Sequence, residues 1–167
     1  KRDNMPDLNF LSGINFKFAI DRLPNLEYYA QSVNIPSTQL GVTNSFPIPF
    51  GQNPMHGDKI EYAPLTVSVR LDEDMDMYLE IYDWIMALAH PEGFKGYKEL
   101  QDTKSVYSDA SLIVLNNTMN PGFEVKFYDV FPVYIGDVRL SAIEEDVGPV
   151  ATDITFQYRF FELMKVK

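Results

Sequence analysis

A long segment rich in proline and glycine, residues 36–64, constrains the fold of this chain more than any other feature. Proline lacks a backbone N–H and is excluded from central positions of a β-sheet. The segment leads directly into Leu65 to Asp72, where apolar and polar residues alternate as in a half-buried strand. It also carries apolar side chains that need cover, namely Phe46, Ile48, Phe50 and Met55. We therefore expect an arm outside the main sheet that another protein chain covers.

The remaining segments predict a mainly β protein. Apolar residues recur at every second position in four segments: Ile14–Ile20, Leu65–Asp72, Phe123–Tyr128 and Ile154–Phe161. Further strands are expected at residues 28–35, 111–115 and 138–142. Because turns rather than helices join these strands, we predict an antiparallel β-sandwich or split barrel with one principal helix. The 167 residues fit a single domain, with residues 1–9 as an N-terminal extension and residues 36–64 as the assembly arm.

The principal helix is expected at about residues 74–90, with acidic residues at its N-terminus and His90-Pro91 at its end. Its apolar residues form two adjoining stripes. We expect the first stripe to pack on the sheet; it consists of Met75, Tyr78, Leu79, Tyr82, Ile85, Met86 and Ala89. The second stripe either lies in the same deep core or contacts a neighbouring subunit; it consists of Met77, Ile81, Trp84 and Leu88.

The charge of the chain limits its partners. The net charge is −10, from 24 acidic and 14 basic residues, and no run of three basic residues occurs. Tight binding to nucleic acid is therefore not expected, because such binding needs clustered lysine and arginine. An acidic wall would instead repel DNA and let it pass, although solubility alone also accounts for the acidity. The absence of cysteine excludes disulfides and favours a protein made in a reducing cytoplasm.

No catalytic, metal-binding or membrane signature is present. His56 and His90 lack further ligands at short spacing, and Glu144-Glu145-Asp146 is typical of a charged turn rather than of a glycosidase pair. We therefore predict no enzyme, no metal and no cofactor. The longest apolar stretch, Ile81 to Ala89, is too short to cross a bilayer, which predicts a soluble protein. Because the first residue is Lys1, we expect the chain to begin inside a longer reading frame or after processing.

Several short motifs occur in a telling order over about residues 10–163. They are Val33-Asn34-Ile35-Pro36, Phe46-Pro47-Ile48-Pro49-Phe50, Gly57-Asp58, a strand from Leu65 to Val69, Tyr82-Asp83-Trp84, Phe131-Pro132, Gly136-Asp137-Val138 and Tyr158 to Glu162. In this order they resemble the tail tube proteins of contractile-tailed bacteriophages and the related tubes of contractile injection systems. The chain departs from this pattern in its polar segment Glu92 to Ala110 and in its longer C-terminal end, Leu163 to Lys167.

The resemblance implies a structural virion protein that forms stacked hexameric rings, the inner tube of a contractile tail and a conduit for genome delivery. Its implied partners are further copies of itself, the tail sheath, and baseplate and tail-terminator proteins. Genomic DNA would pass without specific binding, and the chain would insert into no membrane. Synthesis in the host bacterial cytoplasm and a final place in the virion tail are implied as well.

The resemblance also assigns roles to residues. The inter-subunit arm would use Phe46, Ile48, Phe50 and Met55, and candidate lumen acids are Asp72, Glu144, Glu145 and Asp146. Two alternatives stay open. The first is a baseplate or tail-terminus protein with the same fold that initiates or ends the tube. The second is a carbohydrate-binding β-sandwich, for which Tyr97, Tyr107 and Tyr134 are the candidate exposed aromatics.

Overall fold

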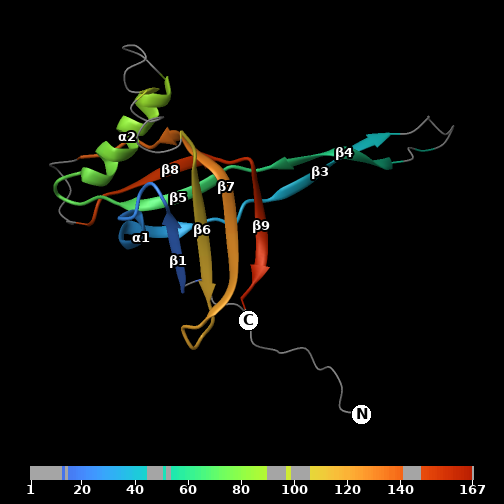
Figure 1. Cartoon of the computed structure of the whole chain (residues 1–167), viewed down its shortest axis with the longest axis horizontal. Coiled ribbons are helices and arrows are strands. Elements are labelled where there is room, and N and C mark those ends of the chain that lie inside the picture. Colours follow the sequence, from blue (N-terminus) through green and yellow to red (C-terminus); the bar gives the residue numbers. More distant parts are fainter. Residues whose placement is uncertain are drawn as a thin grey trace.

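The computed structural model describes residues 13, 15–44, 51, 54–89, 97–98, 106–140 and 148–166. These residues form a mainly β structure with one main helix, as predicted (Figure 1). The elements in chain order are β1 (Phe16–Ile20), α1 (Leu26–Tyr29), β2 (Ala30–Val33), β3 (Thr38–Asn44), β4 (Pro54–Tyr62), β5 (Leu65–Arg70), α2 (Asp76–Ala89), β6 (Ser108–Leu115), β7 (Pro121–Ile135), β8 (Ala151–Gln157) and β9 (Phe160–Lys165).

The main sheet is antiparallel and is organised around the long strand β7. The first part of β7 pairs with β6 on one side and with β9 on the other, and its last part pairs with β8. Strand β1 extends the sheet beyond β6, and β5 and β2 extend it beyond β8. In Figure 1, β1, β6 and β9 run crosswise to β5 and β8. The sheet is therefore split into two parts that β7 joins, and it does not close into a barrel.

The two parts of the sheet meet at a corner. At this corner β7 bends at Asp129, whose φ of 55° lies in the left-handed region that aspartate tolerates better than most residues. Next to this bend lie Tyr158 and Arg159, the two residues that connect β8 to β9. The Arg159 amide donates a hydrogen bond to the Tyr128 carbonyl at 3.0 Å. The Arg159 guanidinium lies 3.6 Å from the Asp129 carboxylate.

Three strand predictions are corrected at their boundaries. The final strand, expected to be continuous over residues 154–161, is interrupted at the corner. The strand expected at residues 28–35 begins as α1 and becomes β2 at Ala30. Residues 138–140 form no strand; Leu140 is exposed there and no apolar face is buried, while residues 141–142 lie outside the described part. The segment before them belongs instead to β7.

The core is one cluster of buried side chains to which β1, β5, β6, β7, β8 and the helices α1 and α2 all contribute. Strands β5, β7 and β8 contribute alternating side chains that are fully buried: Leu65, Val67, Val69, Val125, Phe127, Ile154 and Phe156. Helix α2 adds Met77, Ile81 and Trp84 to the same cluster and contacts β7. Burial of each such side chain contributes roughly 1.5–3 kcal/mol to folding. The alternation in the sequence is thus the direct cause of the sheet's dry face.

The proline-rich arm lies outside the main sheet. Strands β3 and β4 form a separate two-stranded antiparallel sheet. Figure 1 shows this ribbon projecting far from the body of the molecule, on the side opposite to α2. The arm was expected from its prolines, but its two strands were not, although β3 contains no proline and β4 contains only Pro54, its first residue.

Candidate assembly surfaces

The arm exposes apolar side chains along its strands. Leu40 lies opposite Ile60 in the strand register, and the two residues are 49% and 55% exposed. Val42, two positions along β3, is 70% exposed. An isolated two-stranded ribbon is marginally stable in water, so an apolar ribbon far from the core gains stability when another surface covers it. Exposed apolar surface of this kind is typical of a protein contact site.

Two glycines shape the arm at the point where the register of β3 and β4 shifts. This shift lies between Leu40 and Val42. A Cβ atom on Gly57 would lie 2.7 Å from the carbonyl oxygen of Gly41 and 3.0 Å from its carbonyl carbon. Backbone atoms cannot move aside as a flexible side chain can. The close approach of the two strands therefore requires glycine at position 57.

The residues predicted for the inter-subunit arm fall into two groups. Met55 lies in β4 opposite Thr43 and is 53% exposed, which suits a contact role. Phe46, Ile48 and Phe50 lie outside the described residues. Sequence reasoning missed the exposed pair of Leu40 and Ile60 together with Val42. Their alternation in the short run from Thr38 to Asn44 was the available signal.

Helix α2 turns the second stripe inward and part of the first stripe outward. Met77, Ile81 and Trp84 are buried, and Leu88 packs against the same core. The prediction that this stripe contacts a neighbouring subunit is therefore wrong, and the deep-core alternative is right. The outward side carries residues of the other stripe instead, with Leu79 at 51% and Tyr82 at 43% exposure. Contacts from outside the helix explain this orientation.

Those contacts converge on the indole ring of Trp84. Its Nε1–H donates a hydrogen bond to the carbonyl of Val106 at 3.3 Å. The guanidinium of Arg22 lies over the ring, 4.8 Å from its centre, as in a cation–π contact. Burial lowers the pKa of Arg22, yet the side chain stays charged because an arginine pKa lies far above neutral. Trp84 thus gains a polar partner and a cation that only the inward orientation provides.

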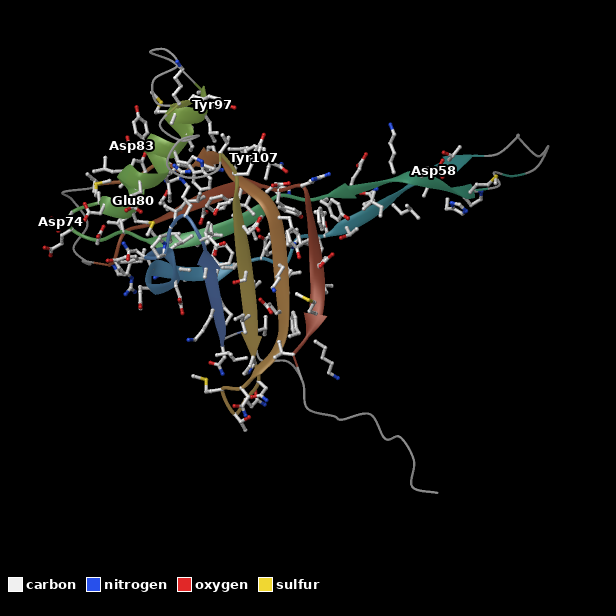
Figure 2. The ribbon with its side chains drawn as sticks, in the orientation of Figure 1. Asp58, Asp74, Glu80, Asp83, Tyr97 and Tyr107 are labelled. Carbon is white, nitrogen blue, oxygen red and sulfur yellow. The ribbon has the colours of Figure 1, made fainter. Side chains whose placement is uncertain are left out.

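The outward side of α2 is acidic as well as apolar. Asp74 precedes the helix, and Glu80 and Asp83 lie on it, at the end of the molecule away from Asp58 on the arm (Figure 2). All three residues near the helix are exposed. The ion pairs found in the described part of the chain involve none of these three carboxylates. The helix therefore presents apolar side chains beside carboxylates that no cation neutralises there.

The candidate lumen acids are described only in part. Asp72 follows β5 and is half-buried, and its Oδ1 is buried with no hydrogen-bond donor among the described residues. Glu144, Glu145 and Asp146 lie outside the described part. These positions remain predictions, because the lumen of an assembly is not defined by a single subunit.

The polar faces of the main sheet carry charges of both signs. On β5 and β8, Ser68 lies opposite Asp153, and Arg70 is exposed at the end of its strand. On β7, the Lys126 ammonium lies 3.9 Å from the Glu124 carboxylate. Each described cation on these two faces thus lies on the same face as a carboxylate. Neither face is the continuous basic surface that binding of a phosphate backbone requires.

A cluster of aromatic rings at the base of the arm was not anticipated from the sequence. It consists of Tyr62, Phe127, Tyr158 and Phe161, and we call it the arm-base cluster. Tyr62 is the last residue of β4, and its ring centre lies 6.0 Å from that of Tyr158 and 5.5 Å from that of Phe161. Phe127 contacts the latter two rings at 5.2 Å and 5.7 Å. Such separations are typical of stabilising aromatic pairs.

The described residues contain no candidate metal centre. Among them, no group of three or more histidine, aspartate or glutamate side chains is placed to hold a metal ion. His56 lies exposed on β4, and His90 lies outside the described part. Within the same ranges, no helix has the length and apolarity needed to cross a bilayer. The arm and the outward side of α2 expose apolar side chains, which makes them candidates for contacts between proteins.

Comparison with known proteins agrees with the resemblance to tail tube proteins that the sequence motifs indicated. No family model matches the chain. The tail tube terminator protein of Enterobacteria phage T4 is 28% identical over 141 residues, which cover 81% of this chain and 77% of that protein. A chain of the tube-terminating cap of the anti-feeding prophage has a similar structure, with a TM-score of 0.70, 12% identity and coverage of 98% and 97%. A chain of the six-fold symmetrised baseplate of that prophage matches with a TM-score of 0.65, 13% identity and coverage of 98% and 99%. The resemblance to tail tube proteins is thereby confirmed.

Proposed function

We propose that this chain, a structural protein related to a phage tail tube terminator, forms the ring that ends the inner tube of a contractile tail. The observation that carries the proposal is the arm, which holds exposed apolar side chains far from the core of its own subunit. A surface of this kind is stable in water only when another chain covers it. In a closed ring, every subunit offers the same arm and the same acceptor surface, so each arm is covered.

The terminal position is favoured over the body of the tube by the sequence relative. That relative is a tail tube terminator, and its similarity extends over most of both chains. A six-fold ring is proposed because the matched baseplate chain comes from a six-fold symmetrised assembly. A tube-body role, in which identical rings stack without limit, is the second candidate. The two roles differ in one measurable respect, since a terminator forms single rings and a tube protein forms long stacks.

The contact through the arm is tested with charges on its apolar side. Val42→Lys places an ammonium group on the most exposed of the described apolar arm residues, and Ile60→Lys does so on the opposite strand. Both variants should remain folded and should sediment as monomers, because the core contains neither residue. Gln39→Lys is the matched control, because Gln39 is exposed, pairs with Glu61 and points to the face away from Leu40 and Ile60. Assembly of Val42→Lys as complete as that of the parent would contradict a role for the arm.

The outward side of α2 is proposed as the surface for a second tail component, such as the sheath. Its exposed Leu79 and Tyr82 would contact apolar residues, and Glu80 and Asp83 would face basic ones. Ring formation should then survive Leu79→Ser combined with Tyr82→Ser, whereas binding of the ring to sheathed tails should fall. A pull-down of sheath by rings of the parent and by rings of the double variant measures this difference. Equal retention of sheath would exclude this surface.

Passage of DNA through the ring is the remaining part of the proposal. The acidic net charge and the mixed charges of the sheet faces support a wall that does not hold a phosphate backbone. The chain would act in the virion tail, with copies of itself, the sheath and baseplate proteins as its partners.

A further inference from the structure

The arm joins the body through only two short connections, residues 34–37 and residues 63–64. A ribbon on two such connections can swing unless side chains hold its base. The structure shows two sets of contacts that do so. One set is formed by Asn34 and hydrogen-bonds the two connections to each other. The other set is the arm-base cluster, which joins the arm to the corner of the main sheet.

The contacts of Asn34 stay local to the connections. Its Oδ1 accepts a hydrogen bond from the Thr66 amide at 2.6 Å, and its Nδ2 donates one to the Pro64 carbonyl at 3.3 Å. The Ala63 amide donates to the Ser37 carbonyl at 3.0 Å. These bonds keep the two connections side by side. They do not link the arm to the far part of the sheet, so they leave the direction of the arm open.

Tyr158 supplies the link that sets this direction. It lies at the corner between β8 and β9, and its side chain is only 8% exposed. The Tyr158 hydroxyl donates a 2.7 Å hydrogen bond to the carbonyl of Ala63, in the second connection of the arm. Its ring contacts Tyr62 of the arm as well as Phe127 and Phe161 of the body. From the corner, Tyr158 therefore contacts the arm at Tyr62 and Ala63 and the body at strands β7 and β9.

We propose that Tyr158 is a positioning residue that fixes the direction of the arm in the isolated subunit, before any partner is bound. This inference rests on the proposed role of the arm as an inter-subunit contact. An arm held in its bound direction loses less conformational freedom when it docks, so assembly begins at a lower concentration. A merely structural role in the core would affect unfolding without affecting the direction of the arm.

The test measures the direction of the arm in the folded subunit. The chain contains no cysteine, so Thr43→Cys on the arm and Asp153→Cys on β8 provide two unique sites for spin labels, and both residues are exposed. Pulsed electron resonance on labelled protein in the Val42→Lys background, which is expected to stay monomeric, gives the distribution of distances between the labels in the isolated subunit. We expect one narrow distribution in the parent and a clearly broader one in Tyr158→Phe, which loses only the hydroxyl.

Tyr128→Phe is the matched control. The Tyr128 hydroxyl also forms a hydrogen bond, at 3.2 Å to the Glu162 carboxylate, but this bond lies on β7 and β9 and not at the arm. Its distance distribution should equal that of the parent. The protein concentration at which half of the subunits assemble should rise about five- to tenfold in Tyr158→Phe, the ratio expected for one net hydrogen bond.

Two results would overturn the inference: a distribution in Tyr158→Phe as narrow as in the parent, or an equally broad distribution in both. The distance measurement does not require assembly. If the parent forms no rings at all, the proposed function fails, while the distributions still decide whether Tyr158 directs the arm.

Discussion

At the scale of single residues, the arm depends on contacts that leave no room for a different side chain. Gly57 passes so close to the Gly41 backbone that a methyl group would overlap it, whereas a Cβ on Gly41 would meet the Lys59 carbonyl oxygen at an ordinary 3.5 Å. Tyr158 reaches the arm with a single hydroxyl. Each of these features permits a substitution of a few atoms with a defined consequence.

Gly57→Ala should distort the arm while leaving the core intact. Relief of the 2.7 Å overlap requires the two strands to separate, at a local cost of about 1–3 kcal/mol. We expect the unfolding midpoint of the subunit to change little and assembly, measured by sedimentation velocity, to be largely lost. Gly41→Ala is the control and should assemble much like the parent. Equal assembly of Gly57→Ala and the parent would show that the close approach is not needed.

Tyr158 also predicts a dependence of stability on alkaline pH. Burial, with a smaller contribution from Tyr62, raises the pKa of Tyr158 from 10.0 to about 12. Between these values the unfolded chain loses the proton and the folded chain keeps it, so the free energy of unfolding falls as pH rises. Urea unfolding from pH 9 to about pH 11.5 should therefore show a smaller decline in Tyr158→Phe than in the parent. Identical declines would indicate that the hydroxyl is not buried.

At the scale of elements, helix α2 shows what sequence patterns leave undecided. Its existence and extent were predicted within about two residues, since acidic residues and a His-Pro step mark its ends. Which apolar stripe faces inward was not predictable, because both stripes have helical spacing. The choice depends on Arg22 and Val106, which lie elsewhere in the sequence and contact Trp84 only in the fold.

The strands, like the helix, were predictable only in part. Alternation predicted β5 and the middle of β7, because one face of each is dry. The corner at Asp129 and the interruption at Tyr158 leave no mark in that alternation. The arm was predicted from its prolines. Met55 lies on β4 of the arm, and its role in an inter-subunit contact stays a prediction. The arm-base cluster could not be predicted, because it brings together rings from three separate strands and the corner between two of them.

Substitutions on the two sides of α2 test the corrected orientation. Ile81→Asp places a carboxylate where the native side chain is fully buried, and we expect the isolated subunit to unfold, with a loss of at least about 4 kcal/mol. Leu79→Asp changes an exposed residue and should alter the free energy of unfolding by no more than about 0.5 kcal/mol. Thermal unfolding followed by circular dichroism measures both. A folded Ile81→Asp subunit would indicate that the stripe containing Ile81 faces outward instead.

At the scale of the whole molecule, the charge distribution predicts how the ring treats DNA. The chain has a net charge of −10, and Lys126 on the main sheet lies 3.9 Å from the carboxylate of Glu124. We expect no measurable retention of duplex DNA by assembled rings at moderate salt, because the negative net charge repels the phosphates. A filter-binding assay tests this expectation. Binding at low micromolar DNA that is lost steeply with salt would reveal a basic surface and would contradict a non-binding conduit.

The central claim is that subunits close into a terminal ring. Negative-stain electron microscopy of the purified chain, at concentrations raised stepwise, tests it most directly. The account predicts single six-fold rings that do not lengthen into tubes, and dispersal of these rings to monomers in Val42→Lys but not in Gln39→Lys. Long tubes would assign the chain to the tube body instead of its end. Monomers of the parent chain at every concentration would contradict ring formation itself.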